Sequence, residues 1–248
     1  MKMYTLSMLI WLLATAGLFA QGNDAIIEQA GDDHSASIEQ VGSTNSALVI
    51  QEVAGNEAII HQEGSNSAQL IQYGVDNRAE INQWAGGQSG IEGASSATIE
   101  QAGDGNNVEV NQFGSHIAEI SQTGEGSNQI NLTQAQGNST VSSFGEEFGS
   151  GAFALLMQHG FSNEITLAQN GSHYAEITQH GSYNTAAVTQ DGLDLGNFAE
   201  IEQDGIQNSA LIEQFGADNA AIIRQYGNGH SARLEQYGNG NRAIITQQ

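Results

Sequence analysis

The sequence predicts an all-β protein, a flattened β-solenoid with cross-β stacking of about ten strand-arc-strand-arc rungs. Three observations point to this fold: a short unit recurs along most of the chain, its apolar residues alternate with a period of two, and the composition suits tight arcs. The 248-residue chain contains 31 Gly and neither Pro nor Cys. Fixed-period repeats of this kind form units that stack on their neighbours.

The repeated unit is anchored by a glutamine that returns mostly every ten or eleven residues. The nineteen anchors are Gln29, Gln40, Gln51, Gln62, Gln72, Gln83, Gln101, Gln112, Gln122, Gln134, Gln158, Gln169, Gln179, Gln190, Gln203, Gln214, Gln225, Gln236 and Gln247. Six residues before each anchor stands Asn or His, except at Ser95 and Ala152. These seventeen positions are Asn23, His34, Asn45, Asn56, Asn66, Asn77, Asn106, His116, Asn128, Asn163, His173, Asn184, Asn197, Asn208, Asn219, His230 and Asn241.

Each unit predicts one strand followed by one arc. Ala210, Ile212 and Gln214 alternate with polar residues, which is the period of a strand. Glycine after the anchor supplies the positive φ that a tight arc needs. Two half-repeats of about 11 residues make one rung, and the inward Gln and Asn amides, which carry donors and acceptors, are expected to bond rung to rung as an amyloid-core ladder.

The chain divides into two regions. Residues 1–20 combine Lys2, an apolar run and a small-residue end at Ala20, which is the order of a secretory signal peptide. The alternative is a membrane anchor, for which the run is short. Residues 21–248 form the repeat β-solenoid, with irregular loops expected near 84–96 and 138–153, the second including a decayed copy of the repeat.

Composition excludes several functions. The chain has 28 acidic and 5 basic residues, a net charge of −23, so we expect no nucleic-acid partner. No catalytic constellation, cofactor-binding motif or metal site is predicted, and the protein is not expected to be an enzyme. His61, His159 and His180 are interpreted as isolated polar residues. A calcium-binding β-roll, an ice-binding solenoid and a β-helix polysaccharide enzyme are alternatives, disfavoured because their turn motifs, Thr ladders and catalytic clusters are missing.

The recurring pattern Ala/Ser-x-Ile-x-Gln-x-Gly-x-x-Asn, carried for example by Ala210 to Asn219, resembles curlin, the subunit of the bacterial curli amyloid fibre. The resemblance extends from Asn23 to Gln247. It implies a secreted structural subunit that polymerises with itself into an extracellular functional amyloid at the bacterial cell surface, serving biofilm matrix and adhesion. The ladder role of the glutamines and asparagines is carried over to the positions given above.

The same resemblance implies three kinds of partner besides the protein itself: a nucleator subunit, an outer-membrane export pore and periplasmic chaperones. Typical curlins have about half as many rungs. They also have a segment between the signal peptide and the first repeat that engages the export pore, whereas only Gln21 and Gly22 lie between the expected signal peptide and Asn23 here. His34, His116, His173 and His230 depart from the usual Ser or Asn, and protonation there is expected to disrupt the ladder. The intact last repeat favours a major subunit over the alternative, a nucleator.

Overall fold

The computed structural model describes residues 22–84, 94–124, 126–135, 140–143, 146–192 and 196–248. The segment expected to be a signal peptide therefore lies outside the described residues. Within them no helix is long and apolar enough to cross a membrane.

Nineteen of the strands form two parallel sheets, one of ten strands and one of nine. We call the ten-stranded one sheet A. Its strands, in spatial order, are β1 (Asp24–Asp32), β3 (Ser46–Ala54), β5 (Ser67–Val75), β7 (Ser96–Ala102), β9 (Ile117–Thr123), β13 (Phe153–Phe161), β15 (Tyr174–Ser182), β17 (Phe198–Ile206), β19 (Ala220–Asn228) and β21 (Arg242–Gln247).

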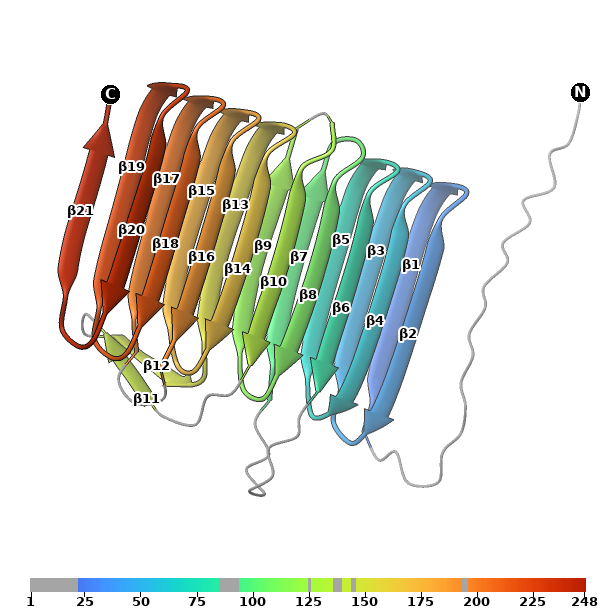
Figure 1. Ribbon diagram of the computed structural model, residues 1–248. Coiled ribbons are helices and arrows are strands. Elements are labelled where there is room, and N and C mark those ends of the chain that lie inside the picture. The colour runs from blue at the N-terminus through green and yellow to red at the C-terminus, as the bar shows by residue number, and fades with distance from the viewer. Residues whose placement is uncertain (1–21, 85–93, 125, 136–139, 144–145, 193–195) are drawn as a thin grey trace, which may run out of the picture.

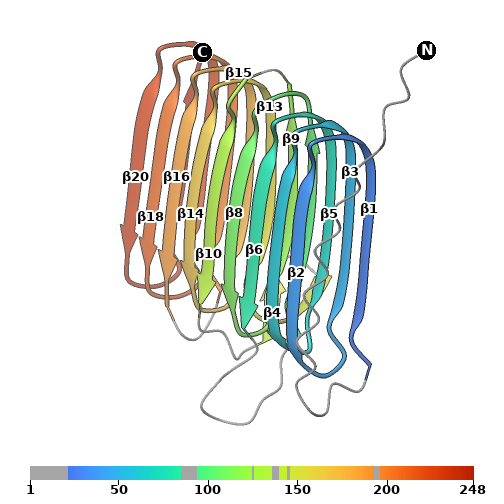
Figure 2. The ribbon, with the colours of Figure 1, turned by 90° about the vertical axis from the view of Figure 1, so that its right-hand side faces the viewer.

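The nine-stranded sheet, sheet B, faces it. Its strands, in spatial order, are β2 (Ser35–Gly42), β4 (Glu57–Gly64), β6 (Arg78–Trp84), β8 (Asn107–Phe113), β10 (Gln129–Ala135), β14 (Glu164–Asn170), β16 (Thr185–Asp191), β18 (Ser209–Phe215) and β20 (Ser231–Tyr237). Consecutive strands of the chain thus alternate between the sheets, and the solenoid advances steadily from β1 to β21 (Figure 1). The view turned by 90° shows the two sheets as facing walls (Figure 2). The predicted flattened β-solenoid is confirmed.

Register is kept across both segments expected to be loops, of which residues 85–93 in the first and 138–139 and 144–145 in the second lie outside the described residues. Gln72 pairs with Gln101 across the first, and Gln122 pairs with Gln158 across the second. A shorter insertion, unnoticed in the sequence, separates β16 from β17, where Gln179 pairs with Gln203. These three insertions lie on connections from sheet B to sheet A, whereas a single extra residue between Gln122 and Gln134 lies on a connection from sheet A to sheet B.

The decayed copy of the repeat expected at 138–144 does not contribute a rung. β11 (Thr140–Ser143) and β12 (Glu146–Ser150) pair with each other in an antiparallel hairpin outside the two sheets. The solenoid therefore has nine two-strand turns and one further strand, in place of twenty half-repeats. The segment has no anchor glutamine, so it lacks the residue that would join it to a ladder. The two strands pair with each other.

The core lies between the sheets and is one residue deep on each side. Most half-repeats contribute a small residue and a branched one, such as Ala175 and Ile177, both 0% exposed, whereas β8, β10 and β14 each contribute two branched residues, such as Ile130 and Leu132. Ala opposite larger side chains lets the two sheets approach closely, and the thin apolar layer is closed at each strand end by a buried amide. Among the described residues no buried side-chain nitrogen or oxygen lacks a hydrogen-bond partner.

The arcs have two positive-φ positions. The expected one is the glycine after the anchor, as at Gly181 (φ 108°), where an added Cβ would lie 2.0 Å from the carbonyl oxygen of Gly205 in the next rung. The other is the residue just before the ladder Asn or His. It is a non-glycine at several arcs, including Asp76, Tyr183 and Asp218 with φ of 55–57°. Of the thirteen described residues with positive φ that directly precede a ladder Asn or His, eight are Gly or Asp, which adopt this conformation most readily.

Candidate assembly surface: the amide ladders

The anchor glutamines form two continuous hydrogen-bonded ladders, one in each sheet. In sheet A, nine Nε2-to-Oε1 bonds of 2.7–2.9 Å connect Gln29 to Gln247. In sheet B, eight such bonds of 2.8–3.0 Å connect Gln40 to Gln236. Neither ladder is interrupted by the insertions. The structure thus brings together all nineteen predicted anchors.

Each anchor glutamine from Gln40 to Gln247 also connects the two sheets through a hydrogen bond to a backbone carbonyl. The second Nε2 proton of Gln179, in sheet A, is donated to the carbonyl oxygen of Glu164 in sheet B at 3.0 Å. Gln190, in sheet B, donates in the same manner to Tyr174 in sheet A at 3.0 Å. A buried amide placed this way has both protons and its oxygen satisfied, which removes the penalty of burying it.

The glutamine ladders have a direction. In every step the amide nitrogen of one rung donates to the oxygen of the rung nearer to β21, as from Gln158 to Gln179 at 2.9 Å. Extending sheet A beyond β1 therefore requires a donor for the Oε1 of Gln29. Extending it beyond β21 requires an acceptor for the Nε2 of Gln247, whose own oxygen already accepts from Gln225. The two ends of the ladder are chemically complementary.

The Asn/His positions form a second pair of ladders by a different bond. The side-chain oxygen of one rung accepts from the backbone N–H of the next, as when Asn219 accepts from Asn241 at 3.0 Å. The side-chain nitrogen donates to backbone carbonyl oxygens: that of a glycine in the neighbouring rung at most positions, as from Asn208 to Gly227 at 2.8 Å, and that of the residue four earlier at some, as from Asn184 to His180 at 3.0 Å. Ser95 and Ala152, which break the sequence rule, take part through their backbone N–H groups, which donate to Asn66 and His116. The predicted ladder positions thus stack in register.

Histidine reproduces the bonds of asparagine at these positions. His116 accepts from the N–H of Ala152 at Nδ1 (3.0 Å), and its Nε2 lies 2.9 Å from the carbonyl oxygen of Phe113. His173 does the same with Asn197 and Asn170, at 3.0 Å each. The N–H donor facing Nδ1 fixes the neutral tautomer that carries its proton on Nε2.

Burial reinforces this neutral state. Desolvation lowers the pKa of His116 and of His173, opposed by the hydrogen bond that each Nε2 makes to a backbone carbonyl. His34 and His230 occupy the same ladder position closer to the two ends and are only half-buried. The expectation that neutral histidine preserves the ladder therefore agrees with the geometry.

The outer faces carry the charge. Glu213 and Glu235 are in register, as the spacing predicts, but Arg233 lies between them and bonds both, with its Nη2 2.9 Å from Glu213. Arg224 likewise contacts Glu200 at 2.6 Å and Glu202 at 3.6 Å. These pairs are substantially exposed, so they contribute little to stability. They lower the repulsion between neighbouring rungs.

Among the described residues, aromatic rings stack along the axis in three places. Trp84 stacks on Phe113 and Phe215 on Tyr237, at centroid distances of 4.5 and 5.3 Å. The third stack contains Phe153, Tyr174 and Phe198, which lie at the starts of their strands, and neighbouring ring centroids are 5.3 Å apart. This stack was not predicted from the sequence. Burial, followed by the negative charge of the nearby Glu176, raises the pKa of Tyr174 to about 12. The residues are 21 and 24 positions apart, so only the rung register reveals the stack.

Taken together, these features define a parallel β-solenoid whose rungs present the same polar and apolar template at every level. A family model described as the curlin associated repeat matches residues 19–42, 31–64, 196–227 and 216–248. These four matches, at both ends of the solenoid, show that the chain contains curlin associated repeats. A comparison with curated proteins gave no match. Curlins are structural amyloid subunits, and the curlin repeats suggest a curli subunit.

Proposed function

We propose that the protein is a secreted structural subunit that self-assembles end to end into curli-like functional amyloid fibres, which serve biofilm matrix and surface adhesion. Its main partner is a second copy of the same chain. A nucleator subunit, an outer-membrane export pore and periplasmic chaperones complete the proposed system, as the family resemblance implies. The fibre is proposed to lie outside the cell, at its surface.

The observation that carries the proposal is the directional ladder. Oε1 of Gln29 is aimed toward one end of the solenoid, and a donor from Gln247 is available at the other. An incoming copy that stacks in the same orientation satisfies both, whereas a copy in the opposite orientation meets donor with donor or acceptor with acceptor. Such a head-to-tail contact does not close on itself, and it therefore generates a filament.

The backbone edge of β21 supports the same direction of growth. The N–H of Ala220, the first residue of β19, donates to Asn241 in the rung of β21 at 2.8 Å. Since N–H groups alternate along a strand, the equivalent N–H groups of Arg242, Ile244 and Thr246 point away from β19. They form the edge that an incoming strand would pair with.

A proline in this edge tests the proposal. Ile244 is 65% exposed, and its N–H faces away from the solenoid, so Ile244→Pro removes one outward donor without breaking a bond to β19. We expect fibre elongation to slow at least tenfold, measured by sedimentation and electron microscopy. Ile244→Ser keeps the N–H and serves as the matched control. It should elongate at close to the parental rate.

Equal elongation of the parental, Pro and Ser chains would contradict growth through β21. A parental chain that folds but stays monomeric would contradict the self-assembly proposal and leave a monomeric binding solenoid as the better reading. Circular dichroism on each chain before assembly establishes that the solenoid has formed.

A further inference from the structure

The register of sheet A places two histidines side by side on the outer face of the solenoid. His159 in β13 and His180 in β15 are direct partners in the parallel pairing, and their ring centroids are 5.8 Å apart. The interpretation of these two residues as isolated, made from the sequence, is therefore wrong. They are 21 positions apart, and only knowledge of the rung length makes them neighbours.

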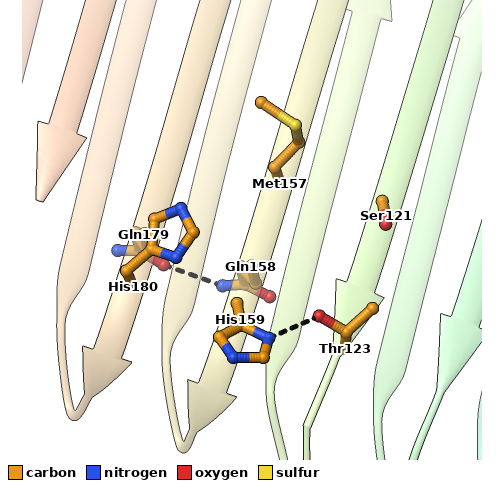
Figure 3. A pocket seen from close by; sticks show the side chains of 7 residues that line it. All are labelled: Ser121, Thr123, Met157, Gln158, His159, Gln179 and His180. Carbon is orange, nitrogen blue, oxygen red and sulfur yellow. Dashed lines mark hydrogen bonds between the residues drawn. The ribbon is translucent and has the colours of Figure 1, made fainter. Parts of the chain in front are cut away.

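The two rings line a shallow open cavity of 190 Å³ together with Ser121, Thr123, Met157 and the anchors Gln158 and Gln179 (Figure 3). Both imidazoles are exposed. The next residue in the same column of sheet A is Asp204, in register with His180. Nitrogen, hydroxyl and carboxylate groups thus follow one another along the axis, in a chain whose net charge of −23 attracts cations.

Thr123 orients the first of these rings. Its Oγ1 lies 2.8 Å from Nδ1 of His159 (Figure 3). When Nδ1 carries the proton and donates to this hydroxyl, the lone pair of Nε2 is free to bind a ligand. Metal-binding histidines are characteristically held by such a bond at the nitrogen that does not contact the ion.

We propose that His159 and His180 form a binding site for a divalent late first-row transition-metal ion, with Thr123 as a positioning residue. Imidazole suits such ions, and Cu²⁺ binds N-donor sites most tightly among them. Metal–nitrogen bonds of about 2.0–2.1 Å place one ion between two rings at this separation. The described residues contain no cluster of three or more His, Asp or Glu side chains suited to a metal. Water in the open cavity therefore completes the coordination.

The site depends on the fold but not on fibre formation. The rings approach one another only when β13 and β15 are paired, so the ion binds the folded chain in preference to the unfolded one. Such binding stabilises the folded state. It also places repeated metal sites along the fibre if the chain assembles, one on each copy.

The test uses Cu²⁺ as the probe on the folded full chain, with excess Ca²⁺ present to occupy carboxylates. Calorimetry is expected to give one Cu²⁺ per chain, and electron paramagnetic resonance should report two nitrogen ligands. His159→Asn, His180→Asn and Thr123→Val should each weaken binding by roughly tenfold or more. His61→Asn is the matched control, because His61 is an outward histidine on sheet B paired with Glu39, and it should bind as the parent does.

Three results would overturn the proposal. The first is unchanged affinity in the His159→Asn/His180→Asn double variant. The second is a spectrum without nitrogen ligands in the parental chain. The third is an equal loss of binding in His61→Asn. The column already contains Tyr73, Ala102, Thr123, Asp204 and Tyr226 at equivalent rungs, so it tolerates varied side chains, and circular dichroism verifies that each variant folds.

Discussion

At the scale of single residues, the protein is organised by side-chain amides that are buried but fully bonded. Gln179 is 0% exposed, accepts from Gln158, and donates to Gln203 and to the carbonyl of Glu164. A hydrogen bond is worth about 1 kcal/mol net, whereas a buried group left unsatisfied costs about 1–3 kcal/mol. The ladder therefore specifies register more strongly than it adds stability.

Truncating one ladder amide tests this view. Gln179→Ala leaves the Nε2 of Gln158 and the Oε1 of Gln203 each without one partner, so we expect a loss of roughly 2–6 kcal/mol in the free energy of unfolding. Gln69→Ala removes an outward glutamine of β5 and should change stability by less than about 0.5 kcal/mol. Denaturant unfolding followed by circular dichroism measures both. Equal effects would mean that the ladder bonds do not matter.

The buried histidines predict a pH dependence of stability. Because the folded-state pKa values of His116 and His173 are lowered, the unfolded chain takes up protons first as the pH falls below about 6.5. Stability is then lost as the pH falls from that value through the folded-state pKa values, and it is fully present above about pH 6.5.

Replacing both residues by asparagine removes this dependence. The His116→Asn/His173→Asn variant keeps the acceptor and donor of the ladder, so its unfolding free energy should decline less between pH 7 and pH 5 than that of the parent. Denaturant midpoints at several pH values provide the measurement. His61→Asn, at a half-buried position on the outer face, is the control and should follow the parental curve. A double variant with the parental pH profile would contradict the assignment.

The ladder residues could be predicted because Gln, and Asn or His six residues before it, recur at nearly constant spacing in the sequence. The tautomer of His116 could not, because it depends on which backbone N–H of another rung faces the ring. The contact of His159 with His180 was missed for a related reason, since it exists only through pairing across 21 residues.

At the scale of strands and arcs, close stacking of glycines sets the geometry. The Cβ position of Gly181 is blocked by the backbone of Gly205, while Gly240 has open space around its own Cβ position. Both glycines have positive φ, of 108° and 70°. Comparing them separates the cost of backbone strain from the cost of a blocked arc.

We expect Gly181→Ala to destabilise the solenoid by clearly more than Gly240→Ala, for which only the left-handed conformation is costly, by about 1–2 kcal/mol. The additional loss at Gly181 arises because the neighbouring rung has to move. Thermal unfolding of the two variants beside the parent gives the comparison. Similar losses would show that the arcs can separate without penalty.

The strands and the arc glycines could be predicted from the period of two and from the anchors. The antiparallel hairpin of β11 and β12 could not, because its segment retains the composition of the repeats without their spacing. Placing the three longer insertions on connections from sheet B to sheet A required knowing which strands share a sheet.

At the scale of the whole molecule, charge opposes assembly. The net charge is −23, and the arginines Arg78, Arg224 and Arg233 are each placed against acidic side chains, all on the outer faces. Two such molecules stacked end to end bring like charges within a few rung spacings. The free energy gained from hydrogen bonds and packing between the two end rungs must therefore exceed this repulsion.

Salt should therefore accelerate fibre growth. Raising NaCl from 10 to 150 mM shortens the Debye length from about 30 Å to about 8 Å, so we expect a severalfold shorter lag and faster elongation. Sucrose at equal osmolality is the control, because it leaves charge repulsion unscreened. Growth rates followed by light scattering that do not respond to NaCl would argue against charge as the main barrier.

Fibre diffraction on the purified chain without its first twenty residues, at neutral pH and with a chelator present, tests the central claim most directly. Stacking of solenoids end to end predicts oriented fibres with a reflection near 4.7 Å along the fibre axis and one near 10 Å across it. A chain that stays monomeric under these conditions, or fibres in which the 4.7 Å spacing is not along the axis, would contradict the account.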